Sequence, residues 1–80
     1  MMPVQLKMAR AALGWGVRRL AKEAGLTANT VSRVENGSNP MQSTVTALQA
    51  TLEAAGVEFI PENGGGPGVR MKKGQAAQKP

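Results

Sequence analysis

The chain has 80 residues, enough for one small domain, and its ten Lys and Arg against five Asp and Glu give a formal net charge of +5. It contains no Cys and no His, which excludes disulfides and thiolate metal sites and removes the usual general base. We therefore expect neither an enzyme nor a bound cofactor or metal, and the positive charge favours a polyanionic partner.

The sequence predicts a protein that stays off membranes. No apolar run approaches the roughly 20 residues that span a bilayer. The first 13 residues carry Lys7 and Arg10 among their apolar residues, so they lack the continuous apolar stretch of a signal peptide. We expect a cytoplasmic, nucleoid-associated location.

Two helices are predicted at the start of the chain. Apolar residues repeat at helical spacing from Pro3 to Leu13, and Gly14 and Gly16 end this helix. Trp15, between the two glycines, is expected to pack as a hinge between helices. A second apolar stripe predicts a helix over residues 17–24. Its outer faces carry three basic residues, namely Arg18, Arg19 and Lys22.

The stretch from Ala24 to Gly37 predicts a turn followed by a third helix over residues 28–35. Gly25 stands just past the second helix, where a left-handed residue is needed, and Thr27 offers a hydroxyl to cap the third. On that helix Val31 and Val34 share one face, and Asn29 and Arg33 share the opposite face. An amide and a guanidinium on an outer face match the major-groove edges of adenine and guanine.

The periodicity changes after a fourth helix, which begins at residue 42 or 43 and runs to about 55. Residues 57–60 and 69–72 predict short β-strands, and Asn63-Gly64 between them is a hairpin signal. The strands pair with each other or across a dimer. The fold class is thus mainly α, with a helix-turn-helix domain over 1–56, a strand or hairpin segment for dimerisation over 57–72 and a disordered basic tail over 73–80.

These residues resemble a known family of DNA-binding proteins, the Cro and phage-repressor helix-turn-helix proteins, also called the XRE family. The resemblance covers residues 4–55 and is densest in Leu20-Ala21-x-x-Ala24-Gly25-Leu26-Thr27-x-x-Thr30-Val31-Ser32-x-Val34-Glu35-Asn36-Gly37. It implies a small lambda-repressor-like bundle of four to five helices, with the third in the major groove and the second across the backbone. The chain departs from the family where strand-like residues replace a fifth helix, so the family's dimer contact is not carried over.

The resemblance implies roles for individual residues. Base edges would be faced by Ala28, Asn29 and Arg33, flanked by Thr30 and Ser32. Phosphates would be contacted by Thr27 and by the backbone amides of Asn36 and Gly37. Gly16 and Val17 occupy the family's usual phosphate-binding position, so Arg18 or Arg19 would take over that contact. As outward charges on the helix that crosses the backbone, Arg18, Arg19 and Lys22 are all expected to anchor phosphates. Arg10 and Glu35 hold positions where such repressors often form an ion pair between helices.

The predicted function is a sequence-specific, DNA-binding transcriptional regulator, a repressor in its simplest form, that acts as a homodimer on a palindromic operator. A core this small favours association with a second copy, and the dimer contacts are expected at Val57, Phe59, Ile60, Val69 and Met71. The alternative is a protein-interaction module, such as an antitoxin or the regulatory partner of a two-protein system. A general architectural or RNA-binding role is disfavoured because one Trp, one Phe and no Tyr are too few for base stacking.

Overall fold

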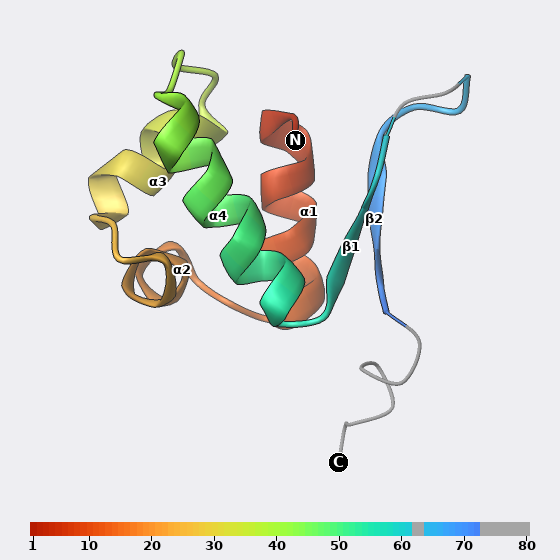
Figure 1. The fold of residues 1–80 in the computed structure, drawn as a ribbon, viewed down its shortest axis with the longest axis horizontal. Coiled ribbons are helices and arrows are strands. Elements are labelled where there is room, and N and C mark those ends of the chain that lie inside the picture. The colour runs from red at the N-terminus through yellow and green to blue at the C-terminus, as the bar shows by residue number, and fades with distance from the viewer. Residues whose placement is uncertain (62–63, 73–80) are drawn as a thin grey trace.

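The computed structural model describes residues 1–61 and 64–72. Four helices are followed by two strands, in the order α1 (Pro3–Leu13), α2 (Val17–Ala24), α3 (Ala28–Glu35), α4 (Gln42–Ala54), β1 (Val57–Ile60) and β2 (Gly68–Met71) (Figure 1). The predicted fold class, a mainly helical bundle with a C-terminal hairpin, is confirmed. Across the described residues, no helix combines the length and apolarity that crossing a membrane requires.

The helices end where local sequence signals predict. Gly14 and Gly25 follow α1 and α2 with φ angles of 71° and 73°, a left-handed conformation that glycine adopts without a steric penalty. Helix α4 ends at Ala54, one residue before the expected end, and Gly56 with a φ of 106° turns the chain into β1. These turns fold the four helices onto one another.

A single core joins the helices and the first strand. Every helix contributes at least two buried apolar side chains, and β1 contributes one, the fully buried Val57. The buried apolar residues are Leu6, Ala9, Leu20, Ala21, Val31, Val34, Leu48, Leu52 and Val57. Because β1 is part of this core, the hairpin is packed against the helices rather than extending from them.

The two strands pair with each other, antiparallel and within one chain, with Phe59 opposite Val69 and Ile60 opposite Gly68. Strand β2 covers residues 68–71 rather than the predicted 69–72, because Gly68 completes the pairing with Ile60. The predicted turn residue Asn63 and the tail 73–80 lie outside the described residues.

The inner face of the hairpin is apolar, whereas its outer face carries the charged side chains Glu58 and Arg70 beside Ile60. Val57 and Phe59 face inward with Val69 and Met71, which pack against the core, as period-2 alternation requires. On the outer face Arg70 donates two hydrogen bonds of 3.1 Å to the Glu58 carboxylate. The hairpin lies against both α1 and α4.

Gln5 fastens the hairpin to α1. Its side chain is buried, and its Nε2 donates to the carbonyl oxygens of Ile60 at 3.0 Å and of Gly68 at 2.9 Å. Its Oε1 accepts a 2.8 Å hydrogen bond from the backbone N–H of Met2 at the start of the same helix. The amide is therefore satisfied at both ends, and it joins α1 to the last residue of β1 and the first of β2.

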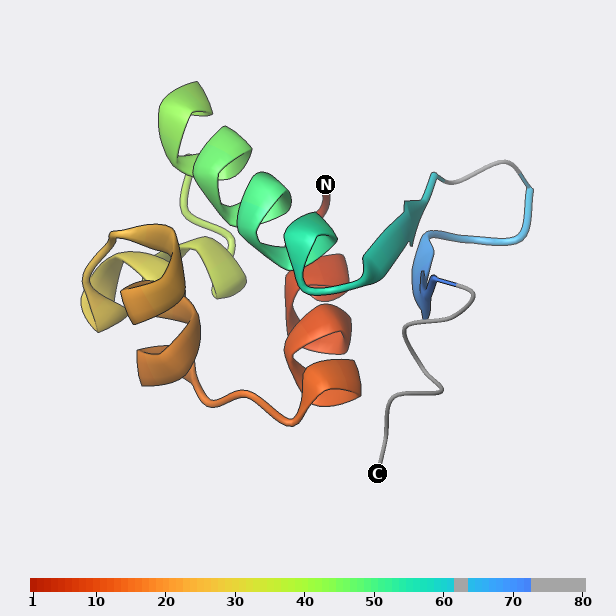
Figure 2. The same ribbon diagram turned by 60° about the horizontal axis from the view of Figure 1, so that its bottom comes forward.

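Helix α1 lies between the pair α2 and α3 on one side and the hairpin on the other, as Figures 1 and 2 both show. The surface of the helix-turn-helix segment is therefore left open by the hairpin.

Candidate nucleic-acid interface

The turn between α2 and α3 is fixed by backbone and side-chain hydrogen bonds. The N–H of Leu26 donates to the carbonyl oxygen of Ala21 at 2.8 Å, which closes the end of α2. Thr27 Oγ1 then accepts from the backbone N–H of Thr30 at 3.2 Å and lies 2.9 Å from the Thr30 hydroxyl. The N-cap predicted for Thr27 is present, so the start of α3 is held at a defined angle to α2.

Helix α3 presents the two faces that its sequence predicts. Val31 and Val34 are buried against α1 and α2, whereas Asn29 and Arg33 are exposed. Within the described part of the chain, neither the Asn29 nor the Arg33 side chain takes part in a hydrogen bond or ion pair. Both are free to bond a ligand on the open side of the helix.

The other residues expected near bases are less exposed. Thr30 and Ser32 are half-buried, and so is Ala28, which packs against the core. Ala28 can offer only part of its methyl group to a partner. The open side of α3 is therefore dominated by Asn29 and Arg33.

The ion pair expected between Arg10 and Glu35 is present at the junction of α1 and α3. Arg10 Nε donates to Glu35 Oε2 at 2.5 Å, and Arg10 Nη2 donates to Glu35 Oε1 at 3.0 Å. Arg10 Nη1 donates to the carbonyl oxygen of Trp15 at 3.0 Å, so the guanidinium also holds the link between α1 and α2. The hydrogen bond to Glu35 raises the pKa of Arg10 above its ordinary value.

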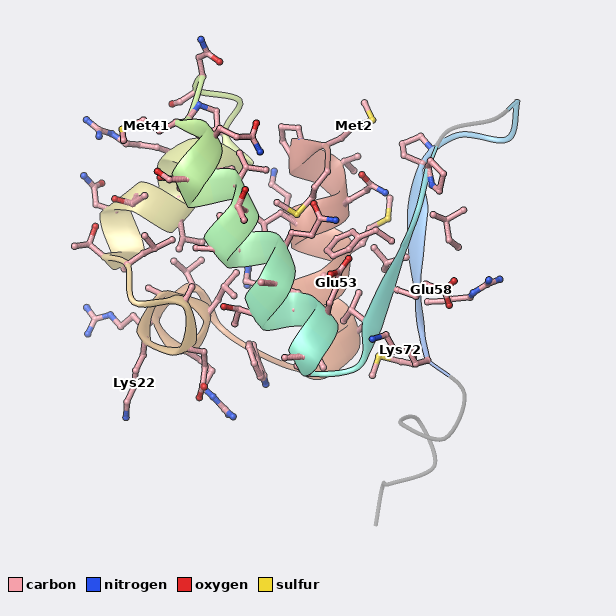
Figure 3. The ribbon with its side chains drawn as sticks, viewed as in Figure 1. Met2, Lys22, Met41, Glu53, Glu58 and Lys72 are labelled. Carbon is pink, nitrogen blue, oxygen red and sulfur yellow. The ribbon has the colours of Figure 1, made fainter. Side chains whose placement is uncertain are left out.

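The basic residues of α2 are exposed, but they are not equivalent. Lys22 projects away from the rest of the molecule (Figure 3), and Arg18 makes no ion pair among the described residues. Arg19 instead lies over the ring of Trp15, 4.5 Å from its centre, and its Nε is 3.0 Å from a carboxylate oxygen of Glu23. Arg18 and Lys22 are thus the more available cations.

The expectation for the backbone amides at the end of α3 was wrong. The N–H of Asn36 donates to the carbonyl oxygens of Ser32 and Arg33, and the N–H of Gly37 donates to that of Val34 at 3.1 Å. These bonds close the C-terminus of α3, so neither amide is available to a phosphate. Only the exposed side chain of Asn36 remains for such a contact.

Two contacts were absent from the sequence-based prediction. Gln5 was expected only as part of α1, and the stacking of Arg19 on Trp15 was not anticipated. Helical spacing gives no signal for the second, because Trp15 lies before α2 begins at Val17. No local signal points to the first, since its acceptors lie 55 and 63 residues further along the chain.

This geometry defines a helix-turn-helix unit in which the outer face of α3 is exposed. The profile of the helix-turn-helix domain family matches residues 4–59, which is more than half of the chain, so the protein belongs to that family. This membership implies DNA binding and confirms the identification made from the sequence. No curated protein matches the chain.

Proposed function

We propose that the protein is a sequence-specific transcriptional regulator that binds double-stranded DNA as a homodimer on a palindromic operator. Repression by occupying a promoter is its simplest output. The observation that carries this proposal is the outer face of α3, where Asn29 and Arg33 stand exposed opposite the buried Val31 and Val34. An amide pairs with adenine and a guanidinium with guanine in the major groove, which gives this face the chemistry to read bases.

Base reading by Arg33 is tested by its replacement with alanine. Arg33→Ala is expected to cost roughly 1–3 kcal/mol on the specific site and to relax the preference at one base pair. Lys7→Ala is the charge-matched control, because Lys7 is an exposed basic residue on α1, outside both the proposed DNA-binding surface and the proposed dimer contact. Gel shifts measure the affinity of each variant for the DNA upstream of the protein's own gene and for a random duplex. If Arg33→Ala weakened binding to both DNAs equally, base readout by Arg33 would be contradicted.

Phosphate anchoring is proposed for α2, above all for Arg18 and Lys22, since Arg19 is engaged with Trp15 and Glu23. Removing one phosphate contact weakens binding to every sequence and lowers the slope of log affinity against log salt by about one. Arg18→Ala and Lys22→Ala should both show this, and Arg19→Ala should show less. An unchanged slope in all three variants would remove α2 from the interface.

The homodimer is proposed to form through the hairpin. Of the five residues expected at its contact, Val57 is fully buried in its own subunit, and Phe59, Val69 and Met71 pack on the same core. Ile60 shares the outer face with Glu58, so it is the apolar side chain best placed to meet a second copy. The strand edges beside it carry backbone groups able to extend the sheet.

Sedimentation of the full chain at micromolar concentration tests the dimer. Ile60→Lys should shift the protein toward monomer, while Val4→Lys, at an exposed apolar position on α1, should leave the association unchanged. Circular dichroism establishes that both variants are folded. A monomeric wild-type protein, or an Ile60→Lys variant that remains dimeric, would refute this contact.

A further inference from the structure

The hairpin is held to the helices by side-chain hydrogen bonds at both of its ends. Where β2 ends, Lys72 Nζ donates to the backbone carbonyl oxygen of Glu53 in the last turn of α4 at 3.2 Å (Figure 3). Where β1 ends and β2 begins, Gln5 Nε2 donates to the carbonyl oxygens of Ile60 and Gly68. In the described part of the chain, no other side-chain hydrogen bond joins the hairpin to a helix.

Gln5 limits the rotation of the hairpin about its link to α4. The chain passes from α4 to β1 through Ala55 and Gly56, so the hairpin leaves the bundle at one short link. Val57, beside this link, is fully buried and stands at the pivot, whereas Ile60 lies about 10 Å farther along the strand. Apolar packing is non-directional, but a hydrogen bond has a preferred length and angle. Gln5 therefore fixes the hairpin at the point with the longest lever arm.

Stability alone does not account for an amide at this position. The Gln5 side chain is buried beside the core residues Leu6 and Ala9, where an apolar side chain of the same size would bury more apolar surface. What the amide adds is a fixed direction between α1 and the two strands. Fixing the register of packed elements is the best-attested use of a buried polar group.

We infer that Gln5 is a positioning residue that sets the separation of the two α3 helices in the dimer, and with it the half-site spacing that the protein accepts. This inference rests on the proposed homodimer joined through the hairpins. In such a dimer each α3 lies about 17 Å from the two-fold axis, half of one turn of DNA. A slack of about 1 Å at Ile60 is a rotation of about 6° about the link, which changes the separation of the α3 helices by about 3 Å. That change is close to the rise of one base pair.

The distance between two labels in the dimer gives a direct test. The chain has no Cys, so a Lys22→Cys variant carries one nitroxide label on α2 of each subunit, and pulsed electron paramagnetic resonance measures their separation without DNA. With Gln5 present, the distance distribution should have one narrow maximum. Gln5→Met keeps the length of the side chain and removes its donors, so the distribution should widen by about 3 Å. Gln49→Met is the matched control, because Gln49 Nε2 donates to Glu53 within α4, and it should match the wild type.

DNA-binding measurements complete the test. Footprinting on the DNA upstream of the protein's own gene locates the half-sites, and duplexes with one base pair inserted or removed between them vary the spacing. The wild type should bind one spacing best, and Gln5→Met should bind the neighbouring spacings almost equally well. Both proteins should bind an isolated half-site with the same affinity, because the outer face of α3 is unchanged. Equal weakening of Gln5→Met on the isolated half-site and the full site would overturn the inference, since it would reduce Gln5 to a stabilising residue.

The two levels of the inference fail differently. A wild-type protein that is monomeric or does not bind DNA contradicts the proposed function. A wild-type dimer that binds DNA, with Gln5→Met giving an equally narrow distance distribution and the same spacing preference, contradicts only the role of Gln5. Circular dichroism establishes that the variants are folded. Gln5→His, which keeps one N–H donor, should widen the distribution less than Gln5→Met, and it takes the place of Gln5→Met if that variant does not fold.

Discussion

Removing the charge of Glu35 should destabilise the protein far more than removing the charge of Glu58. Each carboxylate receives two hydrogen bonds from one guanidinium, Glu35 from Arg10 and Glu58 from Arg70. The Glu35 pair is largely withdrawn from water, with its side chains 7% and 22% exposed, whereas the other pair lies on the open face of the hairpin. The two pairs therefore differ mainly in burial.

Glu35→Gln leaves the Arg10 guanidinium partly buried without a counter-charge. Breaking a buried pair in this way typically costs 3–5 kcal/mol, and the partial exposure of Arg10 places the expected loss near the lower end, at about 3 kcal/mol. For a domain of this size that loss corresponds to a fall in Tm of roughly 12–24 °C. Glu58→Gln, by contrast, should leave the Tm almost unchanged because water screens an exposed pair.

Thermal unfolding followed by circular dichroism at 222 nm measures both variants. Arg10→Met should also be destabilising, and the double variant Arg10→Met/Glu35→Gln should lose less than the sum of its singles, since no unpaired charge remains. Neutral melts for both Glu35→Gln and Arg10→Met would refute the reasoning. Equal losses for Glu35→Gln and Glu58→Gln would show that burial does not set the difference.

Three further outcomes are expected. Gln5→Glu places a carboxylate against two strand carbonyl oxygens. In urea unfolding at pH 7, the free energy of unfolding should fall by about 2 kcal/mol or more. The loss should be smaller below pH 4, where the introduced carboxyl group is protonated. The Arg70 guanidinium lowers the pKa of Glu58. The ion pair therefore contributes its full stability above the ordinary carboxyl pKa of 4.5, and this stability is lost as the pH falls through the lowered pKa. In the Arg70→Met variant, NMR titration of Glu58 should show a higher midpoint. Gly25→Ala, at a φ of 73°, should cost roughly 1–2 kcal/mol in the same unfolding assay.

The helices were predictable because their signals are local. Gly14 and Gly25 end helices by a backbone conformation that other residues adopt at a cost, and the apolar spacing within each helix identifies its buried face. The open face of α3 follows in the same way from the positions of Asn29 and Arg33. The pairing of Arg10 with Glu35 is not local, and it was expected only because the chain resembles a family with that ion pair.

The missed features depend on contacts that form after the chain has folded. In the sequence, Gln5 is one polar residue within a predicted helix. Nothing near it in the sequence indicates that two strand carbonyl oxygens will lie beside its side-chain amide. The N–H groups of Asn36 and Gly37 were expected to face a phosphate, yet they are used to close α3. Which backbone groups remain free at a helix end is decided by the capping geometry, and the sequence states only which residues are present.

Helix α1 connects the candidate DNA-binding surface to the hairpin through two buried polar contacts. Arg10 fixes one side of α1 to the end of α3, and Gln5 fixes the other to the facing ends of β1 and β2. Each contact depends on the direction and distance of its hydrogen bonds, whereas apolar packing alone tolerates sliding. In the proposed dimer, joined through the hairpins, the separation of the two α3 helices would therefore be set by α1 and these two side chains. That separation must match half-sites about one turn of DNA apart, so Gln5 would act on DNA recognition from the far side of the molecule.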